Sequence, residues 1–162
     1  MLRALPLIAC LWLAACDQPP VPSAAPAGSA SAPATGTAPP PSQAGFDDMI
    51  NALRAQAGLP AATPDARLRA AAQAHADDML RNNYVSHTGR NGSDFAQRMR
   101  AAGYASCNPA ENIAAGQTSE AAVLASWTGS AAHRRNLLLP GSVQYGLGRA
   151  GDRWVLLIAR VC

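Results

Sequence analysis

Apolar residues recur at helical spacing just after residue 44. Phe46, Met49, Ile50 and Leu53 stand at i, i+3, i+4 and i+7, so they fall on one face of a helix. Gly58 follows the last of them, and glycine is a typical residue at a helix end. The pattern therefore predicts an amphipathic helix of roughly three turns that packs one face against a core.

Two further helices are predicted before residue 104. The second begins at Thr63-Pro64, because proline is favoured in the first helical turn. Its buried face is formed by Leu68, Ala72, His75 and Met79. The third helix begins at Ser93, packs Phe95 and Met99 against the core, and ends at Gly103.

Extended and helical segments alternate after residue 104. A short extended stretch is predicted around Glu111–Ala114, and Thr118 or Ser119 caps a fourth helix. The apolar face of this helix carries Val123, Leu124 and Trp127. A short helical turn is predicted from Ser130 to Leu138.

The last part of the sequence has the pattern of a β-hairpin. Gln144–Arg149 and Trp154–Val161 are predicted strands, and Gly151-Asp152 between them favours a turn. Three or more helices with a few late strands predict the α+β fold class.

The first sixteen residues carry an export signal. Arg3 gives a short positive start, and the apolar run Leu5–Ala15 is shorter than the roughly 20 residues that span a bilayer. The run ends Leu13-Ala14-Ala15-Cys16, which resembles the bacterial lipobox. We therefore predict a lipoprotein signal peptide at 1–16 and a membrane anchor through lipid on Cys16. The alternative is an ordinary cleavage site beside a chance cysteine.

A tether is predicted between this signal and the domain. Residues 17–44 are almost wholly Pro, Ala, Ser, Gly and Thr, a composition that cannot bury a core and stays disordered. The remaining residues, 45–162, suffice for one modest domain. The predicted location is the bacterial cell envelope outside the cytoplasm, with inner and outer membrane both left open.

Charge and cysteine content narrow the picture further. All 13 basic residues are arginine, and they are scattered rather than gathered in a stripe, so nucleic acid is not an expected partner. Cys10 leaves with the signal and Cys16 carries lipid, so Cys107 and Cys162 remain. In an oxidising compartment these two predict one disulfide.

Three histidines and one glutamate are the candidates for chemistry. His75 lies on the apolar face of the second predicted helix, which favours a buried histidine bonded to the backbone. His87 follows that helix in a polar loop, where functional side chains often lie. His133 falls in the short helical turn and Glu111 on the extended stretch. Two imidazoles and one carboxylate would make a zinc-type site, although sequence spacing alone does not bring them together.

Several blocks, taken together, resemble the bacterial branch of the CAP family. These are the SCP-like proteins, also called cysteine-rich secretory, antigen 5 and pathogenesis-related 1 proteins. The blocks are Ala74–Met79, Tyr84–His87, Ala110–Gly116, Trp127–Leu138 and Gly146–Gly148, followed by an apolar strand. Their order runs through essentially all of 45–162, and the resemblance implies a three-layer α-β-α sandwich.

The resemblance also implies a site. In that family a central cleft gathers two histidines and two acidic residues, and some members bind a divalent metal there. His87, Glu111 and His133 match three of the four positions, while the second acidic residue falls on Ser130. The implied site thus keeps two histidines and one glutamate, with weakened affinity for a metal such as zinc and a water in the vacant position. Ser130 can instead serve as a helix cap.

Three functions are compatible with the sequence. The resemblance favours a binding module whose cleft holds a divalent metal or a lipid, peptidoglycan or envelope-protein ligand. A metal-assisted hydrolase of peptide or cell-wall bonds is the second, with Glu111 or a metal-bound water as the base. A structural envelope protein is the third. No Gly-x-Ser-x-Gly turn supports a serine mechanism, and we expect binding rather than catalysis.

Overall fold

The computed structural model describes residues 43–141 and 143–162. The predicted signal segment 1–16, including Cys16, and almost all of the predicted tether 17–44 lie outside these ranges. The first described helix begins at Gln43, just before the domain start predicted at residue 45.

Within the described ranges the chain forms five helices and four strands. The helices are α1 (Gln43–Gln56), α2 (Ala66–Arg81), α3 (Phe95–Ala101), α4 (Glu120–Gly129) and α5 (Ala131–Leu137). The strands are β1 (Thr63–Pro64), β2 (Ser106–Ala115), β3 (Val143–Ala150) and β4 (Arg153–Val161).

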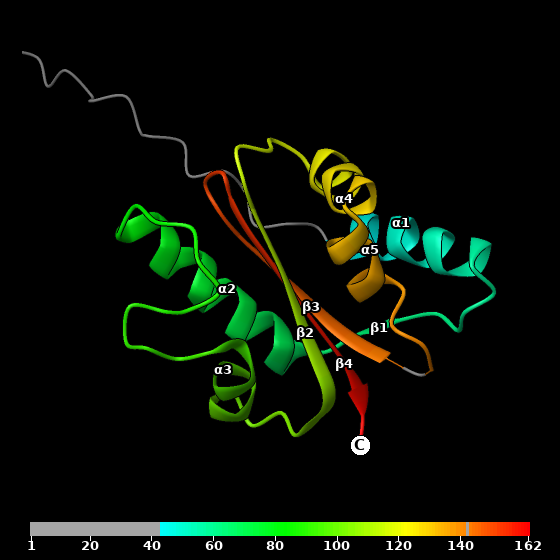
Figure 1. Ribbon diagram of the computed structural model, residues 1–162, viewed down its shortest axis with the longest axis horizontal. Helices are drawn as coiled ribbons and strands as arrows, with labels where there is room; N and C mark the ends of the chain where they lie inside the picture. The colour runs from blue at the N-terminus through cyan, green and yellow to red at the C-terminus, as the bar shows by residue number, and fades with distance from the viewer. Residues whose placement is uncertain (1–42, 142) are drawn as a thin grey trace, which may run out of the picture. The chain divides into compact units, whose positions relative to one another are not determined.

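The four strands form one sheet in the order β1-β3-β4-β2. Strand β1 pairs with β3 in parallel, whereas β4 pairs antiparallel with both β3 and β2. Helices α2 and α3 cover one side of the sheet, and α1, α4 and α5 cover the other (Figure 1). The predicted α+β class and three-layer α-β-α arrangement are therefore confirmed.

Strand β4 shows why the chain needs helices on both sides. Its successive side chains point to opposite faces of the sheet, and both sets are buried. Trp154, Leu156 and Ile158 pack with α1, α4 and α5, whereas Val155, Leu157 and Ala159 pack with α2 and α3. An apolar run buried on both faces is typical of a strand inside a layered sandwich.

Two glycines of β3 bring α2 onto the sheet at backbone distance. A Cβ added at Gly146 would lie 2.1 Å from the Arg69 nitrogen, and one at Gly148 would lie 2.4 Å from the Ala72 carbonyl carbon. No side chain fits at either position. This close approach fixes α2, and with it the start of the loop that carries His87.

Two helix starts differ from the sequence predictions. Thr63-Pro64 does not begin α2 but forms β1, and Asp65 caps the helix by accepting two N–H groups of the first turn. The third helix is capped by Asp94 rather than Ser93, through a reciprocal capping box with Gln97. In both cases an aspartate nearer to the helix satisfies the free N–H groups.

Other predicted elements are present with adjusted bounds. The extended stretch predicted around Glu111–Ala114 is a longer strand, because β2 begins at Ser106. Its pairing with β4 shifts register between Cys107 and Ala110, and this irregularity hides the strand pattern in the sequence. Ser119 caps α4, accepting the Ala122 N–H at 3.2 Å, as one of the two predicted caps.

The predicted disulfide joins Cys107 to Cys162 across 55 residues of sequence. It links the first part of β2 to the residue after β4, so it closes one end of the β2–β4 pair. The chain-entropy model assigns a loop of this size about 4 kcal/mol of stabilisation.

A buried arginine ties α1 to the segment after α5. Arg54 is fully buried and donates only to backbone carbonyls. Nε reaches Pro60 at 2.9 Å, Nη1 reaches Leu137 and Leu139 at 3.0 and 2.9 Å, and Nη2 reaches Gly141 at 3.2 Å. Burial lowers the pKa of the Arg54 guanidinium. Three of these bonds satisfy carbonyls at and just after the end of α5, where helical partners are missing, and the fourth satisfies the Pro60 carbonyl after α1.

Residues 43–162 contain a complete core. Both described hydrophobic clusters, the four-stranded sheet and the disulfide lie within this segment, so we expect it to fold as a unit. In the part of the chain that the structure describes, no helix is both long enough and apolar enough to cross a bilayer.

Candidate functional site

Glu111 stands at the centre of the candidate site, in the middle of β2. Its side chain is only 1% exposed. A buried carboxylate is costly unless it is paired with a cation or hydrogen-bonded. Each of its two oxygens has such a partner, one from the loop after α2 and one from α3.

His87 bonds the first of these oxygens. Its Nδ1 lies 2.7 Å from Glu111 Oε1, and because a carboxylate only accepts, Nδ1 carries the proton and donates. The His87 side chain is 54% exposed, and its Nε2 has no hydrogen-bond partner among the described residues. The site therefore presents a fixed imidazole whose Nε2 faces outward.

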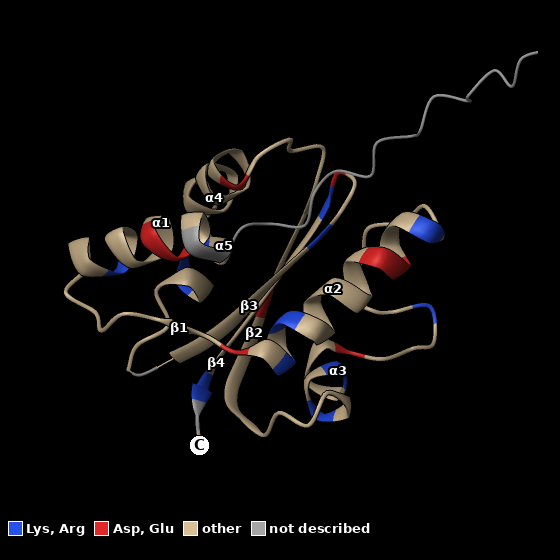
Figure 2. Cartoon of the chain, turned by 180° about the vertical axis from the view of Figure 1, so that it is seen from behind, with Lys and Arg blue, Asp and Glu red and all other residues tan. Residues whose placement is uncertain are grey.

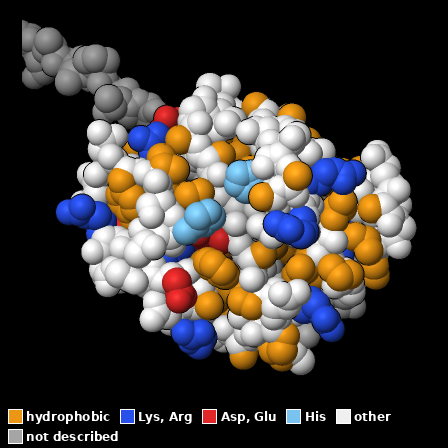
Figure 3. All heavy atoms as spheres, in the orientation of Figure 1, with side chains coloured by type: hydrophobic (Ala, Val, Ile, Leu, Met, Phe, Trp, Pro, Cys, Tyr) orange, Lys and Arg blue, Asp and Glu red, His pale blue; other side chains and the backbone are white. Residues whose placement is uncertain are grey.

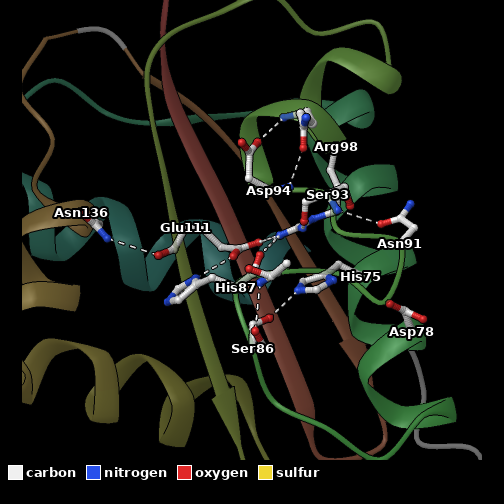
Figure 4. Close-up of polar contacts among 12 residues, drawn as sticks. His75, Asp78, Ser86, His87, Asn91, Ser93, Asp94, Arg98, Glu111 and Asn136 are labelled. Atoms are coloured by element: carbon white, nitrogen blue, oxygen red, sulfur yellow. Dashed lines mark hydrogen bonds and ion pairs between the residues drawn. The ribbon is translucent and has the colours of Figure 1, made fainter.

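Arg98 bonds the second oxygen. Its Nη2 lies 2.6 Å from Glu111 Oε2 and also donates to the His87 carbonyl at 3.1 Å. Its Nη1 donates to the Ser93 carbonyl at 2.8 Å. Figure 4 shows Arg98 reaching from α3 to the Glu111–His87 pair. The guanidinium thus neutralises the buried carboxylate and ties α3 to the loop that holds His87.

His75 is the buried structural histidine that the sequence predicts. It is 2% exposed, and its Nε2 donates to the Ser86 carbonyl at 2.8 Å. This bond holds the residue immediately before His87. Burial, and next the charge of Arg98, lower the pKa of His75.

Two asparagines hold the His133 segment beside Glu111. Asn112 Nδ2 donates to the His133 carbonyl at 3.1 Å. Asn136 Nδ2 donates to the Glu111 carbonyl at 3.3 Å (Figure 4). It also donates to Asn112 Oδ1 at 2.9 Å. These bonds fix α5 against β2. Within the described residues, the partly buried His133 imidazole makes no hydrogen bond to His87 or Glu111.

Ser130, at the position of the missing acidic residue, lies between α4 and α5. It is the C-cap residue of α4 and the N-cap residue of α5. Its backbone carbonyl accepts the Arg134 N–H at 2.8 Å, but its side chain makes no capping hydrogen bond. Ser130 therefore occupies the cap position and caps α5 through its backbone carbonyl, while its side chain takes no part.

The geometry does not complete a set of three metal ligands. Both Glu111 oxygens already have partners, and the described ranges contain no group of three His, Cys, Asp or Glu side chains placed to hold a metal ion. Zinc as a resident cofactor on His87, Glu111 and His133 does not fit this arrangement. The carboxylate instead orients an imidazole, as carboxylates do behind metal-ligating histidines and catalytic histidines.

Sequence analysis missed Arg98 and assigned no role to Asn112 or Asn136. A glutamate on a strand of small and apolar residues signals that some cation lies nearby. The sequence offers 13 arginines and no spacing rule that selects one of them. Both asparagines belong to sequence blocks that resemble the family, but the sequence does not show which distant residues they contact.

Histidine side chains are accessible on one face of the domain. Figure 3 shows them close together, with acidic atoms beside them and apolar side chains around. Since His75 is buried, the other histidines of the chain, His87 and His133, are the imidazoles left for contact with a ligand.

Comparison with known proteins gives consistent matches. The family model for CAP, described as the cysteine-rich secretory protein family, matches residues 48–156. The uncharacterized protein YkwD of Bacillus subtilis (strain 168) is 34% identical over 110 residues, which are 66% of this chain and 42% of YkwD. This chain therefore spans less than half the length of that relative.

Solved structures share the fold. An extracellular protein containing a SCP domain, from Bacillus anthracis, superimposes with a TM-score of 0.69 at 28% identity, covering 72% of this chain and 39% of that one. An outer surface protein from Borrelia burgdorferi gives a TM-score of 0.65 at 20% identity, covering 74% of this chain and 92% of that one. The second likeness bears on the fold alone.

Proposed function

Because this chain belongs to the CAP family, the cysteine-rich secretory proteins, we propose that it is an extracytoplasmic lipoprotein whose domain is a binding module. The location is supported by the similar solved structure that is described as an extracellular protein. The predicted lipid on Cys16 and the predicted tether 17–44 would hold the domain at a membrane.

One observation carries the binding proposal. The His87 imidazole is exposed, yet it is fixed by the buried Glu111, whose charge is balanced by Arg98. A preorganised polar group loses little conformational freedom when a ligand binds. Nε2 can accept a hydrogen bond when neutral and donate one when protonated, so it suits a polar group of an envelope component.

Soluble envelope fragments test this proposal. Residues 43–162 are titrated with a disaccharide-peptide from peptidoglycan and with dihexanoyl phosphatidylglycerol, while NMR follows the His87 ring. We expect one ligand to shift this ring saturably and to bind at least about tenfold more weakly to His87→Ala. Arg100→Ala, an exposed change on α3, serves as the control and keeps the affinity. Equal affinity for His87→Ala would contradict the proposal.

Zinc titration tests metal binding at the His87 site separately. Without three converging ligands, we expect at most weak binding, which disappears in His87→Ala and in His133→Ala. Tight binding that survives both substitutions would place any metal elsewhere.

A hydrolase is the second candidate, and one contact favours it. The Glu111–His87 pair has the geometry of a carboxylate that orients a general base. His87 rather than Glu111 would be that base, since the glutamate is buried and bonded at both oxygens. Turnover of the disaccharide-peptide that is abolished by His87→Ala without unfolding would replace binding by catalysis.

A structural role is tested in cells. If a deletion strain is fully complemented by the His87, Glu111 and His133 triple variant, the protein has a structural role.

The anchor has its own test. Intact-mass analysis of the protein purified from membranes is expected to show diacylglyceryl on Cys16 as the first residue. The Cys16→Ser variant is expected to leave the membrane fraction, and its retention there would contradict lipid anchoring.

A further inference from the structure

A hollow lies beside Arg98, between α2, the loop at 82–94 and α3. Its volume is about 510 Å³, within the range of small-ligand sites. The apolar part of its lining consists of small side chains from the two helices: Ala70, Ala71, Ala74, Ala101 and Ala102. Because these side chains are methyl groups, they leave room for a ligand above them. We refer to this hollow as the alanine groove.

The alanine groove carries an excess of positive charge. Arg81, Arg90 and Arg98 line it together with one carboxylate, Asp78. Arg98 is balanced by Glu111, but the guanidinium groups of Arg81 and Arg90 have no ion-pair partner among the described residues. Arg81 lies in the last turn of α2, and Figure 2 shows basic positions at this end of α2 and on the adjoining loop.

Neutral donors, rather than the guanidinium groups of these arginines, satisfy the carboxylate of Asp78 in the groove. Asp78 accepts the Tyr84 hydroxyl, the Asn82 Nδ2 at 2.7 Å and the Arg90 backbone N–H at 3.2 Å. These bonds, led by the one from Tyr84, lower the pKa of Asp78. The two guanidinium groups therefore stay available for an anion from outside.

Internal bonds preform the loop wall of the groove. Gly89 N–H donates to the Ser93 carbonyl at 2.9 Å, Gly92 N–H donates to the Gly89 carbonyl at 2.9 Å, and Ser93 N–H donates to Asn91 Oδ1 at 3.0 Å. A Cβ at Gly89 would lie 2.9 Å from Ser93 Oγ, so any side chain there would displace the serine from its place in the wall. A ligand thus meets a wall that is already ordered.

We propose that the alanine groove binds the carboxyl-terminal end of a short peptide with small side chains. Guanidinium groups match the planar, two-oxygen geometry of a carboxylate. Asn91 and Ser93 line the same groove and offer both donors and acceptors, which peptide amides use and a simple acyl anion would leave unpaired. The alanines receive methyl-sized side chains. The groove shares Arg98 with the His87 site, but neither His87 nor Glu111 lines it, so the proposal does not rest on the function of that site.

Calorimetric titration of residues 43–162 with N-acetyl-Ala-Ala tests the proposal. The matched ligand is the same peptide with its carboxylate converted to an amide. We expect the acid to bind saturably, and the amide to bind at least about tenfold more weakly because the charge-assisted bonds are lost. The same loss is expected for the acid with Arg81→Gln/Arg90→Gln. Arg134→Gln/Arg135→Gln removes two exposed arginines of α5 and is expected to leave binding unchanged.

A groove-filling variant makes the test independent of charge. Ala74→Leu places a larger side chain inside the groove and is expected to abolish binding, whereas Ala122→Leu at an exposed position of α4 has no effect. His87→Ala is expected to retain peptide binding, because His87 does not line the groove. A failure of the function proposed for His87 can therefore be told apart from a failure of the groove proposal. Circular dichroism confirms that each variant is folded.

Three results would each overturn the proposal: no saturable binding of the acid, equal affinity for acid and amide, or an equal loss with both arginine pairs. A further arm separates the sources of such a peptide end. The same dipeptide is linked through its amino end to soluble dextran. Retained affinity assigns the groove to peptide ends borne on a polymer, and lost affinity assigns it to free peptides.

Discussion

Two arginines of this domain are withdrawn from solvent, and they differ in what they bond. Arg54 on α1 is fully buried and donates to four backbone carbonyls. Arg98 on α3 is 11% exposed and donates both to carbonyls and to the carboxylate of Glu111. The Arg54 network ends at these carbonyls, because none of them orients a further side chain. In the Arg98 network, the carboxylate goes on to orient an exposed imidazole.

The contrast gives a criterion for interpreting buried cations in small domains. A guanidinium that satisfies carbonyls at a helix end contributes to stability alone. A guanidinium that balances a buried carboxylate permits that carboxylate to serve a second, accessible group. By this criterion Arg98 is a positioning residue for His87, whereas Arg54 is a structural tie.

The largest effect is expected from Arg98→Met. Removing one partner of a buried ion pair leaves Glu111 charged and uncompensated, at a cost of about 3–5 kcal/mol in the free energy of unfolding. Urea unfolding measures the loss. In the fraction that remains folded, the NMR signal of the His87 Nδ1 proton is expected to broaden or move. An unchanged signal would show that Arg98 does not position His87.

A smaller loss is expected from Arg54→Met. The substitution leaves buried carbonyls at the end of α5 without donors, and we expect about 2–4 kcal/mol of destabilisation. The His87 Nδ1 signal should stay where it is in the wild type, and this difference from Arg98→Met is what separates the two arginines. Arg100→Met, an exposed change on α3, is the control and should alter stability by less than about 0.5 kcal/mol.

Glu111→Gln tests whether the carboxylate that links Arg98 to His87 orients the imidazole. The amide keeps the shape but replaces charge-assisted bonds by weaker ones. Arg98 keeps its bonds to the Ser93 and His87 carbonyls, so we expect a smaller loss than for Arg98→Met, about 1–2 kcal/mol in urea unfolding. The glutamine side chain has one acceptor oxygen, so it can accept a hydrogen bond from His87 or from Arg98 but not from both at full strength. Ligand affinity at the His87 cleft is expected to fall along with stability, and a loss of stability without any loss of affinity would argue against an orienting role.

The smallest effect concerns pH and His75. Its pKa is lowered in the folded protein by burial, so the unfolded chain binds the proton more readily. Stability from His75 is therefore complete above the ordinary histidine pKa of about 6.5 and is lost as the pH falls below it, by at most about 1.4 kcal/mol per pH unit. Urea unfolding at several pH values measures this slope. The slope below pH 6.5 is expected to flatten in His75→Gln.

Much of the fold could be predicted because its helices repeat apolar residues at helical spacing. The face of α2 with Leu68, Ala72, His75 and Met79 is buried as the pattern indicates. The hairpin of β3 and β4 is equally clear in the sequence, since β4 is apolar on both faces. Helix starts are harder to predict, because Asp65 and Asp94 compete with neighbouring residues as caps and only the folded chain selects between them.

The candidate site could be predicted only in part. The family resemblance selects Glu111 and His87, and the structure brings these two together at 2.7 Å. Their dependence on Arg98 could not be foreseen, because that contact joins α3 to β2 and sequence periodicity carries no information on pairs across a fold. For the same reason the sequence does not show that His87 and Arg98 already occupy both oxygens of Glu111. His87, Glu111 and His133 therefore do not converge as three metal ligands.

The sheet order has a consequence for how the chain is made. Strand β4 stands between β3 and β2 and supplies both cores, yet it comes last among the elements. A ribosome therefore releases all five helices before the strand against which they pack. Until residues 153–161 emerge, neither core can close, so the preceding helices are expected to stay open to proteases and to the export machinery until β4 has been made.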